Sequence, residues 1–275
     1  MKKIYFCLFF LILFCFNLVW AQNFAGRKKQ IIVEAPGKSL KVGEYLEYSV
    51  EFLGMPMGSV ILKIEEITNF SGHQCYHFSG RLLTNKISAH FYNFEYEVNS
   101  YVDTTTFQPL FFQKKRRIKN KIDFVEVNFD WKEKKAISSY KWIDQDSANS
   151  ALEFQTGQNK AASNTIADDT QDLLSSFYYF RLQDVKVAES LPVNIYYNQK
   201  NWPISITIEK PFLKEIRNQG TFSVFGASVN SAIVNFILGD KQFIVYFTTD
   251  HRRIPLEFDV GTNLGFIRCR LKKMS

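Results

Sequence analysis

Residues 43–52, with the sequence Gly-Glu-Tyr-Leu-Glu-Tyr-Ser-Val-Glu-Phe, alternate apolar and polar side chains. In an extended chain, one face carries the apolar side chains and the other carries the glutamates and the serine. A period of two is typical of a strand buried on one side. Residues 54–58 supply the glycine and proline of a turn, and the alternation resumes at residues 60–64. The pattern therefore predicts a β-hairpin over residues 44–67.

The rest of the chain continues in the same way, with apolar alternation between clusters of turn residues. Its 27 phenylalanines and 13 tyrosines suit strands, because aromatic side chains pack well on a pleated, half-buried surface. We expect about a dozen strands in all, joined by tight connections such as a four-residue hairpin loop at 198–201. The later strands are predicted near residues 74–84, 90–103, 107–118, 125–131, 136–142, 193–197, 204–208, 220–238, 241–249, 252–260 and 265–272.

One amphipathic helix is predicted among these strands. It follows residues 143–168, a polar segment whose composition predicts a long exposed loop. Asp169 is expected to cap the helix and Asp172 to occupy its third position. An apolar stripe then recurs at helical spacing and is expected to pack on the sheet: Leu173, Leu174, Phe177, Tyr178 and Phe180. The sequence thus predicts an all-β fold with one amphipathic helix, an antiparallel curved sheet or incomplete β-barrel.

The first 21 residues have the three parts of a secretory signal peptide. Lys2 and Lys3 precede an apolar run that is shorter than the roughly 20 residues of a spanning helix, and Val19-Trp20-Ala21 ends in a small residue. This pattern predicts cleavage before Gln22 and a periplasmic location, with an uncleaved N-terminal anchor as the alternative. Residues 22–40 would then form an N-terminal extension, and residues 41–275 a single β-rich domain.

Four segments of this domain form an ordered set of short motifs that covers most of residues 40–273. They are residues 43–50 with Gly54 and Gly58, residues 101–103 with Pro109, residues 172–181, and residues 249–256 with Gly265. Taken in this order, they resemble the bacterial family of exported proteins called domain of unknown function 3108. Phe247, Thr248 and Thr249 depart mildly from the family, which places an aromatic residue and a serine before its acidic turn. The resemblance implies an exported β-rich domain and no catalytic residue.

A basic run is the densest charged feature, with six cations in eight residues. Strand alternation would divide them between two faces. Their sum could attract an anionic envelope partner such as lipid head groups or lipopolysaccharide phosphates, whereas nucleic acid is disfavoured in an exported protein. The alternative is a solvated strand whose lysines discourage aggregation. The candidate anion-binding residues are Lys114, Lys115, Arg116, Arg117, Lys119 and Lys121.

His73, Cys75 and His77 share one face of a predicted strand, which raises the possibility of a metal site. At about 3.3 Å per residue the two histidines lie roughly 13 Å apart, too far to share one ion. A pair of these residues with a further ligand from elsewhere in the chain is the alternative. We predict no metal and no cofactor. Outside the signal peptide the cysteines are Cys75 and Cys269, which could form one disulfide or remain two buried thiols.

No catalytic motif stands out, so the function is expected to be non-enzymatic. The leading hypothesis is a binding or assembly module that holds an envelope amphiphile or polymer in an aromatic-lined concavity, with peripheral membrane contact as an open question. A hydrolase acting on cell-wall or lipid material is the first alternative. A carboxylate close to His77, His90 or His251 inside a pocket would favour it. An outer-membrane structural component is the second alternative.

Overall fold

The computed structural model describes residues 40–89, 94–119, 121–144, 155–156, 161–231, 242–262 and 264–275. The predicted signal peptide and all but the last residue of the N-terminal extension lie outside these residues. So do positions 145–154 and 157–160 of the predicted polar loop. Among the described residues, no helix is long and apolar enough to span a membrane.

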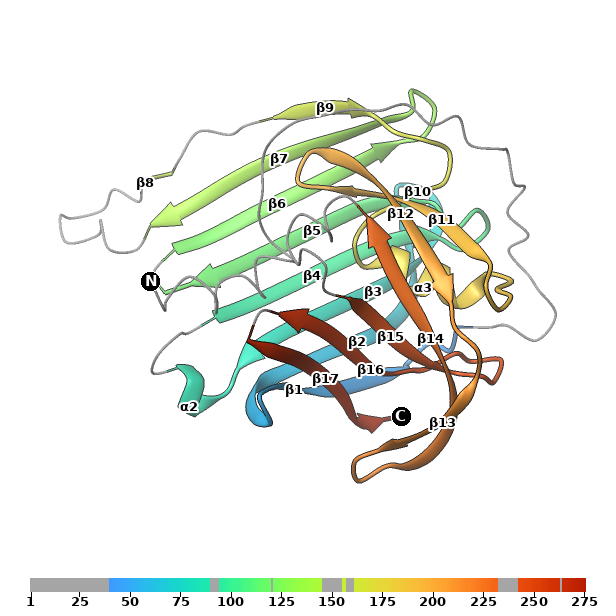
Figure 1. Ribbon diagram of the computed structural model, residues 1–275. Coiled ribbons are helices and arrows are strands. Elements are labelled where there is room, and N and C mark those ends of the chain that lie inside the picture. The colour runs from blue at the N-terminus through green and yellow to red at the C-terminus, as the bar shows by residue number, and fades with distance from the viewer. Residues whose placement is uncertain are drawn as a thin grey trace.

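The described chain folds into one sheet of seventeen strands (Figure 1). All of the strand pairs are antiparallel except β10–β11, which is parallel. The strands are β1 (Tyr45–Phe52), β2 (Met55–Phe70), β3 (His73–Thr84), β4 (Phe94–Asp103), β5 (Pro109–Ile118), β6 (Lys121–Asp130), β7 (Lys135–Asp144), β8 (Gln155–Thr156), β9 (Ala162–Thr165), β10 (Thr170–Gln171), β11 (Ser190–Tyr197), β12 (Lys200–Ile208), β13 (Phe212–Ile216), β14 (Gly220–Ser231), β15 (Phe243–Thr248), β16 (Pro255–Thr262) and β17 (Gly265–Met274). Two helices accompany them, α2 (Lys86–Ala89) and α3 (Ser175–Leu182).

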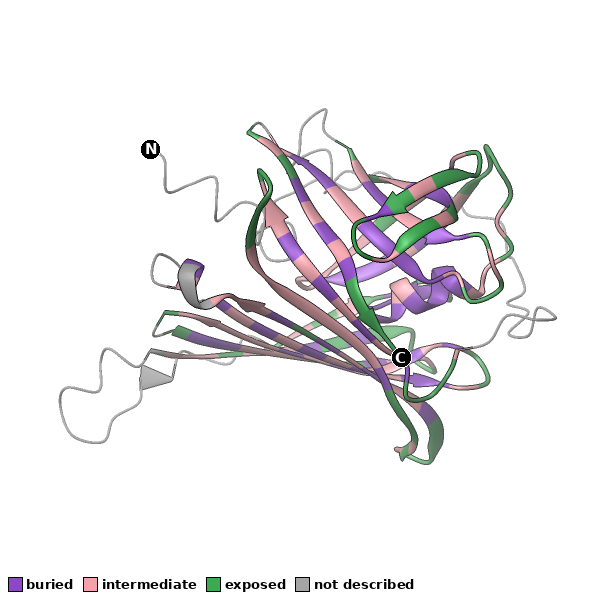
Figure 2. Cartoon of the chain, turned by 90° about the horizontal axis from the view of Figure 1, so that it is seen from below, coloured by how far each residue is buried: buried purple, intermediate pink, exposed green. Residues whose placement is uncertain are grey.

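The pairings run from β10 through β11, β12, β14, β15, β16 and β17 to β1, and onward through β2 to β7 and β9. The first and last strands are therefore neighbours, with Phe52 of β1 opposite Ile267 of β17. The sheet curves round so that its two arms face each other, and α3 lies between them (Figure 2). This architecture confirms the predicted all-β, antiparallel curved sheet.

The two ends of the sheet approach each other without forming a backbone ladder among the described residues. β9 pairs with β7, and β10 pairs with β11. Side chains bridge the gap: the Tyr196 hydroxyl donates to Asn164 Oδ1 at 2.8 Å, and Asn201 Nδ2 donates to the Thr165 carbonyl at 2.6 Å. We call this junction the seam. The sheet is thus an incomplete barrel whose last joint is made by side chains.

Helix α3 begins later than the sequence predicts. Thr170 and Gln171 join the sheet as β10, so the helix starts at Ser175. Asp172, rather than Asp169, accepts the first free amides: its Oδ1 receives the Leu174 and Ser175 N–H groups at 2.8 Å each. Asp169 instead accepts a hydrogen bond from a strand asparagine. The predicted cap was wrong because a short parallel strand takes the residues assigned to the first helical turn.

Two predicted loops also differ from the structure. The connection at 198–201 is a two-residue turn, because Tyr197 pairs with Lys200 and both central residues have positive φ, Asn198 at 50° and Gln199 at 60°. The polar segment 143–168 contains the short strands β8 and β9. Short strands of this kind carry too few alternating residues to be recognised in a sequence.

The end of the wrap beside α3 is filled by side chains. Tyr178 of the helix stacks on Phe78 of β3 with ring centroids 4.0 Å apart, and Phe107 packs beside them. A buried ion pair holds the C-terminal end of the helix, where Arg181 donates to both carboxylate oxygens of Glu44 at 2.6 and 2.7 Å. Arg181 also donates to the Arg252 carbonyl. The helix therefore closes one end of the curved sheet and is fixed there by a charge pair excluded from water.

Candidate ligand-binding cavity

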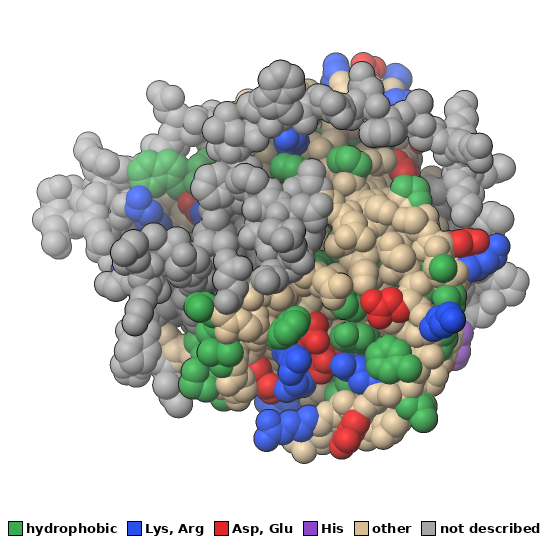
Figure 3. Space-filling view, viewed as in Figure 1, with side chains coloured by type: hydrophobic (Ala, Val, Ile, Leu, Met, Phe, Trp, Pro, Cys, Tyr) green, Lys and Arg blue, Asp and Glu red, His purple; other side chains and the backbone are tan. Residues whose placement is uncertain are grey.

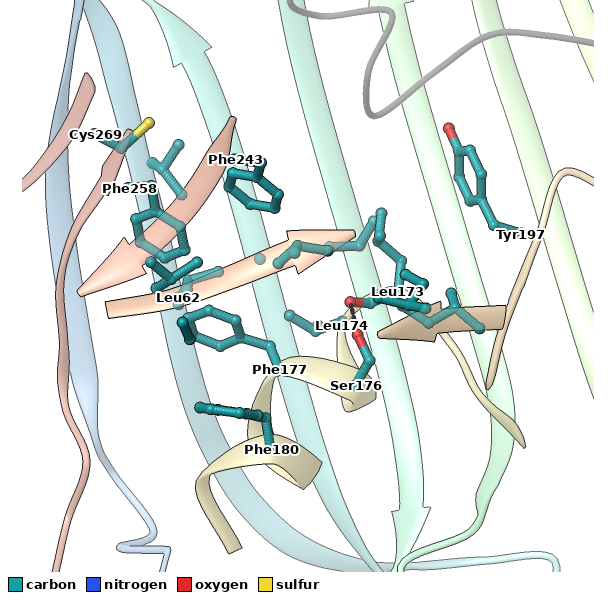
Figure 4. Close-up of a pocket in the computed structure, with 18 of the residues that line it drawn as sticks. Leu62, Leu173, Leu174, Ser176, Phe177, Phe180, Tyr197, Phe243, Phe258 and Cys269 are labelled. Atoms are coloured by element: carbon teal, nitrogen blue, oxygen red, sulfur yellow. Dashed lines mark hydrogen bonds between the residues drawn. The ribbon is translucent and has the colours of Figure 1, made fainter. Parts of the chain in front are cut away.

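Between α3 and the concave face of the sheet lies a cavity of about 330 Å³ (Figure 4). Its wall is almost wholly hydrocarbon. One arm of the sheet contributes residues of β2, β3 and β4, and the other contributes residues of β11, β12, β14, β15 and β16. Prominent side chains of the wall are Leu62, Leu82, Val98, Trp202, Ile204 and Phe243. Strand alternation makes this surface, because every second residue of each strand faces inward.

The strand register explains how these side chains come together. In antiparallel pairs, residues directly opposite each other share a face. Leu62 of β2 lies opposite Gly80 of β3, which lies opposite Val98 of β4. A second row runs beside it and joins Val60, Leu82 and Tyr96. All six residues line the cavity, so two register rows build one apolar wall.

Gly80 fits this wall because it has no side chain. A Cβ atom built on it would lie 2.7 Å from a methyl group of Val98 and 3.4 Å from one of Leu62. A larger residue would force these neighbours to move. Leu174 of the segment that enters α3 also lies 3.7 Å from that position. The glycine therefore lets the helix and the sheet approach closely at the base of the cavity.

Helix α3 forms the base with apolar side chains. Phe177 and Phe180 project from it toward the sheet, and Phe177 stacks on Phe258 of β16 with ring centroids 5.4 Å apart (Figure 4). The polar atom of the lining residue Ser176 bonds within the chain, since its hydroxyl donates to the Leu173 carbonyl at 2.9 Å. The predicted apolar stripe of the helix is thus confirmed, and it faces both the sheet and the cavity.

The inner face changes character at β5. The first register row continues from Val98 to Lys114, and the second continues from Tyr96 to Arg116. Arg116 lies opposite Asp123 of β6, and its Nε donates to Asp123 Oδ2 at 2.6 Å. The Tyr140 hydroxyl of β7 donates to the other oxygen of Asp123 at 2.9 Å. A polar wall therefore adjoins the apolar wall on the same concave surface.

The other candidate basic residues face outward or lie at the strand ends. Lys115 is opposite Glu97, with Nζ 3.9 Å from its carboxylate, and Arg117 is opposite Glu95. Lys119 is exposed in the turn, and Lys121 lies over the Trp142 ring at 5.6 Å. The predicted division of the run between two faces is confirmed. On the visible outer surface, basic and acidic side chains are interspersed (Figure 3).

The histidine and cysteine candidates do not converge on the cavity. His73 Nδ1 donates a hydrogen bond to Asp103 Oδ2 at 2.9 Å, and His77 Nε2 donates one to Asn99 Oδ1 at 3.0 Å while its ring stacks on Tyr101. Within the described ranges, no three or more His, Cys, Asp or Glu residues are grouped as metal ligands would be. His251 is exposed, and His90 lies outside the described residues.

Among the described residues, Cys75 and Cys269 are free and buried. Cys75 lies in β3 and Cys269 in β17, where it lines the cavity. Burial raises the pKa of the Cys75 thiol to about 11 and that of the Cys269 thiol to about 12. Of the two alternatives in the sequence, the structure has two protonated thiols rather than a disulfide. Neither is activated as a nucleophile, because the thiolate is the reactive form.

The sequence pattern of the family described as a protein of unknown function, DUF3108, matches residues 47–272. The chain belongs to this family. The match spans the strands from β1 to β17 and confirms the resemblance found in the separate segments. No curated protein matches the DUF3108 chain in sequence.

Among solved structures, the DUF3108 chain is similar to a beta-barrel-like protein of another domain of unknown function, DUF1849, from Brucella abortus. The TM-score is 0.53 at 8% identity, over 85% of this chain and 97% of that chain. It is also similar to a candidate lipoprotein from Parabacteroides distasonis, with TM-score 0.31, 8% identity and coverage of 87% and 98%. A candidate exported protein with a YmcC-like fold from Bacteroides fragilis gives TM-score 0.30, 6% identity and coverage of 86% and 98%. The first similarity supports the barrel-like fold of this DUF3108 member.

Sequence reasoning on the DUF3108 chain proposed an aromatic-lined concavity but did not identify the residues that line it. The wall residues belong to strands that are separated by more than a hundred positions, such as Leu62 and Ile204. Alternation showed which of them share a face within a strand. It gave no information about which strands of the two arms face each other, so the position of the concavity and its lining residues were not predicted.

Proposed function

We propose that this DUF3108 protein is a non-enzymatic binding module that holds the apolar part of an amphiphile between α3 and the curved sheet. The cavity is the observation that supports this proposal. Its volume of about 330 Å³ falls in the range of small-molecule sites, roughly 300–1,000 Å³. Hydrocarbon walls offer water too few hydrogen-bond partners. Transfer of an apolar ligand from water into such a space therefore lowers the free energy.

The distribution of aromatic side chains supports a ligand space over a completely filled core. Phe78, Phe107 and Tyr178 pack on one another and fill the end beside the helix. Phe177, Phe243 and Trp202 line the cavity instead. Natural cores are close-packed, with few voids larger than a water molecule. A cavity of this size is therefore an exception that a bound ligand would explain.

The hydrolase alternative lacks the cluster that would favour it. Among the described residues that line the cavity, none is a histidine or a carboxylate. His77 bonds to Asn99, away from the lining, and His251 is exposed. General acid–base catalysis needs such groups within hydrogen-bond reach of the substrate. The described lining supports binding and contains neither a histidine nor a carboxylate for acid–base catalysis.

Export, periplasmic location and contact with the envelope belong to this proposal as its setting. They rest on the predicted signal peptide. Fractionation of the native host would test them, because a periplasmic protein is released by osmotic shock. The alternative of an outer-membrane component requires detergent for release. The same proposal includes a role as an assembly module. In that role the outward-facing Lys115 and Arg117 would contact a lipopolysaccharide or another polymer.

The test of the cavity uses an uncharged apolar dye, N-phenylnaphthylamine, whose fluorescence rises in a hydrocarbon environment. We expect the wild-type chain to bind the dye and Ile204→Trp, which places an indole in the cavity, to weaken binding by about tenfold or more. Ile137→Trp is the matched control, because Ile137 lies on a strand and is 45% exposed. Failure of the wild type to bind, or equal binding by both variants, would contradict the proposal.

A further inference from the structure

Two neighbouring turns of the sheet carry exposed apolar side chains. Leu53 lies in the turn between β1 and β2 and is followed by Met55, and Leu264 lies in the turn between β16 and β17 and is followed by Phe266. Each of these four side chains is at least 50% exposed. Large apolar residues on a protein surface are normally scattered singly, so a group on adjoining turns indicates a contact surface. We call these four residues the apolar tip.

The register of β1 makes the two turns neighbours. Phe52, the last residue of β1, lies opposite both Ile267 of β17 and Met55 of β2. A Cβ atom built on Gly265 would lie 2.8 Å from a methyl group of Leu53, so the first turn touches the second. The apolar tip is therefore one patch at one end of the sheet.

The apolar tip lies at the end of the sheet away from α3 (Figure 1). Along β16, Phe258 stacks on Phe177 of the helix, Val260 then lines the cavity, and the turn follows. Val60 of β2 also lines the cavity, and it lies between Met55 and the middle of that strand. The apolar wall of the cavity thus leads from the helix toward the apolar tip.

A basic turn lies at the same end of the sheet. In an antiparallel meander every second turn falls at the same end, so the β5–β6 turn shares the end of the β1–β2 turn. Lys119 lies in this turn and Lys121 follows it, and both are exposed, while Asp144 of β7 lies opposite Lys121. These five basic and three acidic residues carry a formal charge of +2. The outward register rows beside the turn add Arg81, Glu97 and Lys115 in one row and Glu95 and Arg117 in the other.

The separation of the apolar tip from the basic turn favours a broad, flat partner. Five steps from strand to strand lead from β17 through β1, β2, β3 and β4 to β5. At about 4.8 Å per step, the two features are roughly 24 Å apart along the sheet. A lipid surface can meet both at once, because apolar side chains enter its hydrocarbon boundary while cations meet its acidic head groups.

We propose that this end of the incomplete barrel docks on an anionic phospholipid membrane. Leu53, Leu264 and Phe266 insert at the interface, and Lys119 and Lys121 lie among the head groups. Docking brings the apolar wall of the cavity to the membrane, from which an amphiphile enters it without crossing water. The inference goes beyond the proposed function, because the cavity can bind a ligand in solution without this surface.

The first test measures binding to phospholipid vesicles by flotation. Wild type and variants are purified from the native host, so that every protein has the same N-terminus. The wild type should bind vesicles of phosphatidylglycerol and phosphatidylcholine about fivefold or more tightly than vesicles of phosphatidylcholine alone, and high salt should reduce this difference. No binding to the anionic vesicles, or equal binding to both kinds, would overturn the inference.

The second test removes the apolar tip. The double variant Leu264→Ser/Phe266→Ser should bind anionic vesicles about tenfold or more weakly than the wild type, because two apolar side chains no longer enter the interface. The matched control is Phe212→Ser/Leu213→Ser on β13, which removes a phenylalanine that is 42% exposed and a leucine that is 74% exposed. It should change binding by less than about twofold. Equal losses in the two double variants would refute the role of the apolar tip, and thermal melts check that both fold.

A second copy of the chain is the competing occupant of the apolar tip. Size-exclusion chromatography with light scattering, without vesicles, should show a wild-type monomer. A wild-type dimer that Leu264→Ser/Phe266→Ser dissociates would assign the patch to self-association and overturn membrane docking.

Docking and cavity binding fail independently of each other. Ile204→Trp, which fills the cavity, should keep vesicle binding within about twofold of the wild type. If the wild type binds N-phenylnaphthylamine in solution but does not bind vesicles, docking is wrong and the cavity function stands. If it binds vesicles but not the dye, the cavity function is wrong and docking stands.

Discussion

The inner surfaces of β2–β4 and of β5–β7 are built by the same alternation, yet two of their register rows change from apolar to charged side chains at β5. Along one register row, Leu62, Gly80 and Val98 form an apolar wall, and the next residue of that row is Lys114. Along the adjacent row, Tyr96 is followed by Arg116 and Asp123. The two regions share one sheet and one curvature. The comparison teaches that alternation assigns a side chain to a face, while neighbouring strands decide what chemistry that face has.

The largest expected effect comes from breaking the support of the apolar wall. Arg181 and Glu44 have side chains that are 1% and 8% exposed, and they anchor the helix that forms the cavity base. Glu44→Gln leaves the Arg181 guanidinium buried without a counter-charge. We expect the free energy of unfolding to fall by about 3–5 kcal/mol, as measured by urea denaturation.

The control for this change is the exposed pair of Lys272 and Glu47, in which the lysine side chain is 66% exposed. Lys272→Met should lower the free energy of unfolding by less than about 1 kcal/mol, because water already solvates both charges. A similar loss in the two variants would show that burial does not set the contribution of the Arg181 pair.

The second largest effect on the free energy of unfolding is expected at the polar wall. Asp123→Asn removes the charge that Arg116 contacts, and we expect the free energy of unfolding to fall by about 2 kcal/mol. Glu126→Gln, at a half-buried position of the same strand, is the control and should lower the free energy of unfolding by a smaller amount. An equal loss in the two variants would show that the contact of Asp123 with Arg116 makes no special contribution to stability.

One buried carboxylate contacts β4, a strand of the apolar wall. Asp172 is fully buried and accepts a hydrogen bond from Ser100 of β4, and burial raises its pKa from 3.8 to about 6. Because this folded-state pKa is above the unfolded value, the native state binds the proton more tightly. The contribution of Asp172 to stability is therefore fully present below about pH 4 and declines as the pH rises to about 6.

This pH dependence can be isolated with Asp172→Asn. The difference in the free energy of unfolding between wild type and variant should change by about 2 kcal/mol between pH 4 and pH 7, with the wild type relatively more stable at the lower pH. Denaturant titrations at several pH values measure it. A difference that does not vary with pH would contradict the raised pKa of Asp172.

The smallest effect is expected on the outer face of β5. Lys115→Met removes a cation that is 40% exposed and 3.9 Å from Glu97, and it should change the free energy of unfolding by less than about 0.5 kcal/mol. A thermal melt is sufficient to measure this. A loss as large as that of Asp123→Asn would erase the distinction between the two faces of the basic run.

Much of this fold could be predicted from the sequence because the signal is local. Alternation in residues 44–67 predicted the first hairpin, which the structure forms from β1 and β2. Local reasoning failed at Thr170 and Gln171, where pairing with β11 takes precedence over the helical pattern. Local reasoning also missed β13, because the pairing of its five residues with β14 is not apparent from alternation.

The site was less predictable than the fold because it depends on distant neighbours. The division of the basic run between two faces followed from alternation alone. That Lys114 is the inward-facing residue beside a cavity required the row through Val98 and the ring of Tyr197 from the far arm. The contact between Lys114 and Tyr197 is made only after the sheet has curved, because it joins β5 to β11, with five other strands between them along the chain.

The pairing of β1 with β17 has a consequence for the time course of folding. Arg270 bonds to Glu51 across 219 residues, and Tyr48 bonds to Pro255 across 207. Contacts of such long range carry a large loop-closure entropy and slow the folding of β proteins. Until β17 has been synthesised, β1 and β16 each present an unpaired edge that could aggregate. Completion of the sheet is therefore a late step, and a chaperone that shields these edges would raise the yield of folded protein more than it would change its final stability.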